Sequence, residues 1–123
     1  MSKQLPVLEE PAGAVACCTP MSQAPLDAGD AADLAGAFKA LGDPIRLQLM
    51  SMIASAAGGE VCVCDLTPAF DVSGPTISHH LRVLREAGLI DGDRRGTWVY
   101  YRPIRDKLSA LSALLDMAAP VPA

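Results

Sequence analysis

Aromatic residues are scarce in this 123-residue chain, where Phe, Trp and Tyr together make up 4% of the sequence. A chain of this length forms one domain, or one small domain with a tail, and burying further surface in a dimer would stabilise it. Long apolar runs are also lacking, since Asp116 and Pro120 interrupt the best C-terminal candidate, 108–121. We therefore expect no membrane span. The N-terminus lacks a secretory layout, so we expect a cytoplasmic protein.

An excess of basic residues is absent too, because the formal net charge is −4. The charge is nevertheless segregated along the chain. Residues 73–107 carry seven basic and four acidic residues, whereas the remainder carries three basic and ten acidic ones. An acidic protein with one basic third can still present a positive face to phosphates. The composition therefore argues against a general nucleic-acid coat and leaves a localised DNA-binding surface open.

The chain divides into an arm, a folded domain and a short tail. Residues 1–28 contain four prolines and no sustained periodicity, which predicts a flexible N-terminal arm. Residues 29–118 are expected to form one domain, and 119–123 a tail. Within the domain, the apolar spacing predicts a helix over 30–41 with Asp30 as its cap, and a second helix that starts at Pro44 and ends at the glycine pair 58–59.

The middle of the domain predicts a helix-turn-helix followed by a hairpin. A short extended segment is expected over 61–64, a short helix over 65–70, and a longer helix over 75–87 that is closed by Gly88. The loop 91–96 and the β-prone run after it predict a β-hairpin with a basic tip. This order indicates a mostly α fold with a small β-hairpin, which is a winged helix-turn-helix.

The helix expected over 75–87 has the polar face that a DNA-reading helix needs. On a helical wheel its apolar residues share one side, while small hydroxyls, an imidazole and an arginine fall on the other. Any solvated helix shows polar residues outward, but the basic wing beside this one favours DNA binding over a catalytic or metal-binding role for its histidine. The predicted DNA contacts are Ser73, Thr76, Ser78, His79, Arg82, Arg94 and Arg95.

The terminal helix keeps an apolar stripe with little domain left to cover. Pairing with its twin across a two-fold axis, helped by the 30–41 helix, is the natural use of that stripe, and folding back onto its own subunit is the alternative. A symmetric dimer would present two recognition helices to double-stranded DNA and predicts an inverted-repeat operator. The predicted dimerisation residues are Leu34, Phe38, Leu108, Leu111 and Leu115.

Four cysteines occur in two pairs, Cys17-Cys18 in the arm and Cys62-x-Cys64 just before the predicted helix-turn-helix. Residues two apart on a strand point the same way, so both sulfurs of the second pair can reach one site. Thiolates select soft ions: trivalent arsenic or antimony takes three, whereas zinc or cadmium takes four. The remaining ligands must then come from Cys17 and Cys18, of the same or the partner subunit. Inert buried thiols and a thiol-oxidation switch are the alternatives.

Three stretches of the chain, 38–47, 60–66 and 75–89, resemble the ArsR/SmtB family of metal-responsive repressors. The stretch Glu-Val-Cys-Val-Cys-Asp-Leu is similar to the arsenic-responsive branch. The resemblance implies a dimeric winged-helix repressor that occupies its operator without metalloid and leaves when arsenite binds. Some members of the family carry a vicinal cysteine pair on an N-terminal arm, as this chain does.

The sequence departs from the family pattern at several positions. Thr67 occupies the place of a third cysteine, so Cys62 and Cys64 cannot complete a three-thiolate site locally. Gly74 stands where many relatives carry glutamine, and a glycine has no side chain to contact a base. The terminal helix carries Asp106 and Asp116 but no histidine, whereas zinc sensors of the family carry both histidines and acidic residues there.

The sequence as a whole predicts an arsenite- or antimonite-responsive repressor that binds operator DNA as a homodimer, with As(III) or Sb(III) as inducer and no organic cofactor. A repressor of the same fold that senses cadmium, lead or thiol oxidation is the closest alternative. A thiol-dependent reductase is disfavoured, because no cysteine opens a helix within a phosphate-binding loop. A zinc-stabilised protein-binding module is a third alternative. We expect no enzymatic activity.

Overall fold

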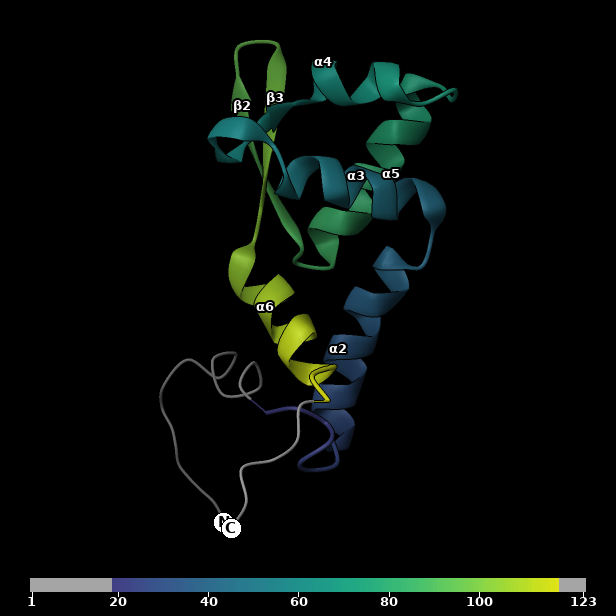
Figure 1. Cartoon of the computed structure of the whole chain (residues 1–123). Coiled ribbons are helices and arrows are strands. Elements are labelled where there is room, and N and C mark those ends of the chain that lie inside the picture. The colour runs from purple at the N-terminus through teal and green to yellow at the C-terminus, as the bar shows by residue number, and fades with distance from the viewer. Residues whose placement is uncertain (1–18, 118–123) are drawn as a thin grey trace.

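The computed structural model describes residues 19–117, so Cys17, Cys18 and the expected tail over 119–123 lie outside the described residues. The described part contains helices and one small antiparallel sheet, as predicted. Helices α2 and α6 form one end of the molecule, and α4 lies near the opposite end (Figure 1). No helix in residues 19–117 combines the length and the apolar character that a membrane crossing requires.

The first two helices are each capped by an aspartate. Helix α2 spans Ala28–Leu41, and the side chain of Asp27 accepts a hydrogen bond from the backbone N–H of Asp30. The sequence predicts Asp30 as the cap, and this prediction is wrong. The helix begins earlier, Asp27 is its cap, and Asp30 lies within the first turn. Helix α3 spans Pro44–Ala54 and is capped by Asp43, as the Asp-Pro pair indicates. It ends before the glycine pair, which lies in a short 3₁₀ turn.

The helix-turn-helix consists of a short, irregular first helix and a regular second one. Strand β1 covers only Val61–Cys62, helix α4 follows over Val63–Leu66, and a 3₁₀ turn continues it over Thr67–Ala69. Helix α5 spans Gly74–Glu86, within one residue of the predicted range at each end. Gly88 follows with φ of +78°, a left-handed conformation that favours glycine past a helix end.

The wing is a tighter hairpin than the sequence predicts. Strand β2 spans Ile90–Arg95 and β3 spans Trp98–Pro103, joined by a two-residue turn at Gly96 and Thr97. The expectation of a loop over 91–96 is therefore wrong for 91–95, because those residues pair in register with β3 and only Gly96 lies in the turn. Strand β1 adds to the other edge of β3, giving the order β1-β3-β2.

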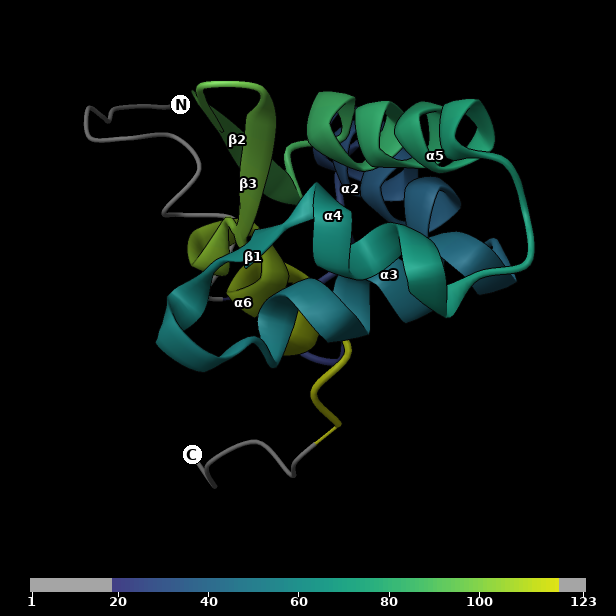
Figure 2. The same ribbon diagram turned by 90° about the horizontal axis from the view of Figure 1, so that it is seen from above.

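The core lies between α3, α5 and the base of the hairpin. Its fully buried large side chains are Leu49, Ile53, Leu66, Ile77, Leu81, Leu84, Leu89 and Ile90. Burial of one such side chain contributes roughly 1.5–3 kcal/mol. Helix α6, Arg105–Leu114, returns beside α2, where Lys107 Nζ lies 2.9 Å from Asp33 Oδ2. Seen from above, the hairpin and α5 lie along the same edge of the molecule (Figure 2).

Candidate nucleic-acid interface and thiol site

Helix α5 turns a polar face to solvent. Ser78, His79 and Arg82 are exposed, while Ile77 and Leu81 on the opposite side are buried. The Nη2 atom of Arg82 lies 3.1 Å from His79 Nδ1. Since arginine only donates, Nδ1 accepts in this bond. The face therefore carries a hydroxyl, an imidazole and a guanidinium within one turn of helix.

The predicted contacts at the start of α5 form its cap. Ser73 Oγ accepts a hydrogen bond of 3.2 Å from the backbone N–H of Thr76 and lies 2.8 Å from Thr76 Oγ1. Ser73 is exposed and Thr76 half-buried. These two hydroxyls fix the beginning of the helix, whose N-terminal dipole favours anions such as phosphate.

The two wing arginines have different surroundings. The side chain of Arg94 is exposed and makes no hydrogen bond or ion pair with any residue in 19–117. Arg95 makes a two-bond ion pair with Glu60, with distances of 2.5 Å (Nη1–Oε2) and 2.9 Å (Nη2–Oε1), and its Nε donates to Asp93 Oδ2 at 3.0 Å. These bonds raise the pKa of Arg95 and, reciprocally, hydrogen bonding from Arg95 lowers the pKa of Glu60. The tip is therefore less basic than its sequence indicates.

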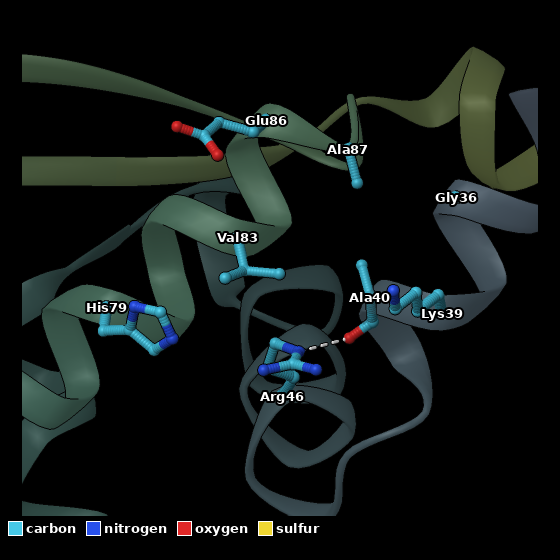
Figure 3. A pocket seen from close by; sticks show the side chains of 8 residues that line it. All are labelled: Gly36, Lys39, Ala40, Arg46, His79, Val83, Glu86 and Ala87. Carbon is cyan, nitrogen blue, oxygen red and sulfur yellow. Dashed lines mark hydrogen bonds between the residues drawn. The ribbon is translucent and has the colours of Figure 1, made fainter.

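Arg46, which sequence reasoning did not single out, links α3 to both neighbouring helices. Its Nε donates to the carbonyl of Ala40 at 2.6 Å, and its Nη1 lies 3.1 Å from Nδ1 of His80 on α5. It also lines an open groove of about 460 Å³ between α2, α3 and α5, shown in Figure 3 with the bond to Ala40 dashed. The capping pair Asp43-Pro44 places Arg46 in the first turn of α3, but its partners become known only from the fold.

The thiols of Cys62 and Cys64 lie against each other. The structure joins them as a disulfide, with 5.1 Å between their Cα atoms. The expected extended segment over 61–64 ends at Cys62, so a strand-to-helix turn, and not a strand, brings the sulfurs together. Cys62 Sγ accepts a hydrogen bond from the backbone N–H of Cys64 at 3.1 Å and so caps α4. Cys62 is buried and Cys64 exposed, so the pair is open to solvent from one side.

No third metal-binding side chain joins this pair within residues 19–117. Thr67, at the position of the missing cysteine, donates its hydroxyl to the carbonyl of Val63 at 3.1 Å. The other predicted ligands, Cys17 and Cys18, lie outside the described residues. Once the disulfide is reduced, Cys62 and Cys64 supply two thiolate ligands, and completing a three-thiolate site needs a sulfur from outside this range.

The predicted dimerisation residues differ in exposure. Leu34 and Leu111 are buried within their own subunit, and Phe38 and Leu108 are half-buried. Leu115, just past α6, is 51% exposed. Two methionines near it are exposed as well: Met117 at 70%, and Met21, in the segment bound to the end of α6, at 46%. The part of the predicted surface that is free to meet a second copy is therefore the end of α6.

Comparison with known proteins places this architecture in a family. A family model described as "Bacterial regulatory protein, arsR family" matches residues 43–91, from the cap of α3 to the start of β2. The arsenic resistance transcriptional regulator ArsR1 of Pseudomonas putida is 51% identical over 65 residues, which is 53% of this chain and 49% of that protein. The chain thus spans about half the length of this relative.

Two further matches extend over a larger share of the related protein. A putative arsenical resistance operon repressor of Halobacterium salinarum is 38% identical over 102 residues, 83% of each chain. A crystal structure titled as a possible transcriptional regulator for arsenical resistance has a TM-score of 0.57 and 35% identity, and the match covers 63% of this chain and 78% of that one. The chain belongs to the arsR family of bacterial regulatory proteins, which are winged helix-turn-helix transcriptional regulators and not enzymes.

Proposed function

We propose that this chain is a cytoplasmic arsenite- or antimonite-responsive repressor that binds operator DNA as a homodimer and leaves it when As(III) or Sb(III) binds. The observation that carries the proposal is the contact between the sulfurs of Cys62 and Cys64 at the first helix of the helix-turn-helix. Two adjacent thiolates favour a soft, thiophilic ion over a hard one. A ligand bound there acts on the backbone that leads into the DNA-reading unit.

The DNA-binding half of the proposal rests on the shared edge of α5 and the wing (Figure 2). On α5, Ser78, His79 and Arg82 are available to base edges and phosphates, and on the wing Arg94 is free within the described residues to meet the backbone. Two such edges related by a two-fold axis would bind an inverted repeat in double-stranded DNA.

The arm supplies the further sulfurs in this proposal, and we propose that it is the arm of the partner subunit. Residues 19–23 are bound to the end of α6, where Met21 N–H donates to the carbonyl of Leu114 at 3.0 Å and Ser22 Oγ donates to that of Asp116 at 3.2 Å. That end of the subunit is opposite to α4 (Figure 1). Because the first described residues are held at that end, the proposal takes Cys17 and Cys18 from the partner subunit rather than from the same one.

Arsenite titration with operator DNA tests the proposal. Fluorescence anisotropy with the upstream intergenic DNA should show an affinity loss of about 5–150-fold in the wild type, which is the usual range for an allosteric coupling. Cys62→Ser and Cys64→Ser should abolish the loss, and the double variant Cys17→Ser, Cys18→Ser should need more arsenite. Thr67→Ala is the matched control and should respond as the wild type does. Release of DNA by arsenite from both Cys62→Ser and Cys64→Ser would contradict the assignment.

A second candidate is a thiol-oxidation switch, which the contact between the two sulfurs also favours. In that reaction both thiols lose a proton and one electron each to form the disulfide, and one hydrogen peroxide molecule is reduced to two waters. DNA release by peroxide, reversed by dithiothreitol, with no release by arsenite under reducing conditions would support this candidate. Cadmium and lead titrations of the same variants distinguish a sensor of those ions.

A further inference from the structure

We infer that Glu60 is a positioning residue that couples the Cys62–Cys64 thiol pair to the wing through Arg95, an inference that rests on the proposed function and deepens it. Sequence reasoning assigned Arg95 to DNA and gave Glu60 no role. The structure shows that the two side chains hold each other, and that they connect the segment carrying the thiols to the hairpin.

The contacts form a continuous path. Glu60 directly precedes β1, which carries Cys62 at its end. Strand β1 pairs with β3 in the register Val61↔Tyr101 and Cys62↔Tyr100. The guanidinium of Arg95 lies over the ring of that same Tyr100, 4.6 Å from its centroid, and grips both carboxylate oxygens of Glu60. A chain of neighbouring contacts therefore links Cys62 to Tyr100, Tyr100 to Arg95, and Arg95 to Glu60.

The geometry of the Glu60–Arg95 pair suits transmission of a displacement. A carboxylate and a guanidinium joined by two parallel bonds are fixed in orientation as well as in distance. Strand β1 has only two paired residues, and the Glu60–Arg95 pair adds a side-chain connection from its start to β2. Arg95 ends β2 directly before the hairpin turn. A displacement of Cys62 on ligation would therefore move the tip of the wing through Glu60.

Asp93 provides a matched comparison. It also accepts a hydrogen bond from Arg95, at 3.0 Å, but it lies two residues away on the same strand. Its bond organises the hairpin internally and makes no connection to β1. Glu60→Gln and Asp93→Asn thus each replace one of the two carboxylates that accept hydrogen bonds from Arg95. Only Glu60→Gln interrupts the connection to the segment that carries the thiols.

The experiment compares the full-length wild type, Glu60→Gln and Asp93→Asn. Operator affinity is measured with and without arsenite, and arsenic binding is followed by its sulfur–arsenic absorbance. We expect all three proteins to bind arsenite alike. Glu60→Gln should reduce the arsenite-induced change in affinity by about 2–30-fold, the range reported for residues on coupling networks, while Asp93→Asn keeps it. Arg95→Gln should reduce the change equally, and the double variant Glu60→Gln, Arg95→Gln should add nothing further.

A second readout is independent of DNA. Trp98 is the single tryptophan, is 51% exposed and faces Arg95 in the hairpin register. In a Cys17→Ser, Cys18→Ser background, phenylarsine oxide bridges two thiols, and its binding to Cys62 and Cys64 should change Trp98 emission. The change should persist with Asp93→Asn and be lost with Glu60→Gln.

The outcomes separate the two proposals. A wild type that keeps its operator affinity in arsenite contradicts the proposed function, and the Trp98 readout still decides the role of Glu60. A Glu60→Gln protein whose Trp98 response and arsenite-induced release both equal those of the wild type overturns the present inference and leaves the proposed function intact.

Discussion

At the scale of single residues, Asp43 caps the start of α3 and lies close to His80 of α5. Its Oδ2 accepts hydrogen bonds from the N–H groups of Arg46 at 3.1 Å and Ile45 at 3.0 Å, and lies 4.0 Å from His80 Nδ1. The bond from the Arg46 N–H is the main cause that holds the Asp43 pKa below its usual 3.8, with help from the positive charges nearby. The ionised carboxylate therefore stabilises the fold.

This depressed pKa predicts how stability depends on pH. The stabilisation is complete above the unfolded-state pKa and is lost as the pH falls through the lower folded-state value. Asp43→Asn keeps an acceptor at the cap but has no charge to lose. Between about pH 5 and about pH 2, the unfolding free energy of the wild type should fall more steeply than that of the variant in urea titrations. Parallel pH curves for the two proteins would show that Asp43 contributes no such stabilisation.

Single residues could be interpreted from the sequence when their partners are close along the chain. Gly88 after the helix was predicted in this way, because its conformation depends on local geometry alone. The sequence predicts Arg95 as a DNA contact, yet its partner Glu60 lies 35 residues earlier and becomes a neighbour only through the β1–β3 pairing. Charge counts along the chain cannot detect such neutralisation.

At the scale of elements, the end of α5 depends on one left-handed residue. A Cβ at Gly88 or at Gly74 would meet no atom within 4 Å, but only Gly88 has a positive φ. Gly88→Ala should therefore lower the unfolding free energy by about 1–2 kcal/mol through backbone strain. Gly74→Ala, at the first turn of the same helix, is the matched control and should be neutral or stabilising by up to about 1 kcal/mol. Equal effects of the two substitutions in chemical denaturation would contradict this explanation.

Helix α5 could be predicted to within one residue at each end, whereas the end of α3 and the short elements could not. Helix α5 has Ile77, Leu81 and Leu84 at helical spacing, which fixes both its extent and its buried face. Strand β1 and helix α4 contain two and four residues, too few for any periodicity to appear. The polar run Asp91–Arg95 has the composition of a loop, but pairing with β3 makes it a strand.

At the scale of the whole molecule, the sequence could predict which chemistry the site offers but not how it is assembled. Four sulfurs in two pairs indicated a soft-ion or redox site, and two of them meet in the structure. The position of residues 19–23 relative to this pair is a property of the fold, because they are bound at the end of α6, opposite to α4 (Figure 1). Counting cysteines in the sequence cannot tell which subunit supplies the further sulfur ligands.

The same end of α6 gives the test of the dimer. Leu115 is 51% exposed there, beside the exposed Met117, and a second copy would cover both. Leu115→Glu should place a charge in that interface and shift the protein towards monomer in light scattering at micromolar concentration. It should also weaken operator binding, because the two DNA-binding subunits would no longer be held together on the two half-sites.

Val72→Glu is the control, since it changes another exposed apolar residue, in the turn before α5, and should leave the molar mass in light scattering unchanged. A wild type that is monomeric under these conditions contradicts the predicted homodimer, and a dimeric Leu115→Glu protein contradicts this location for its interface.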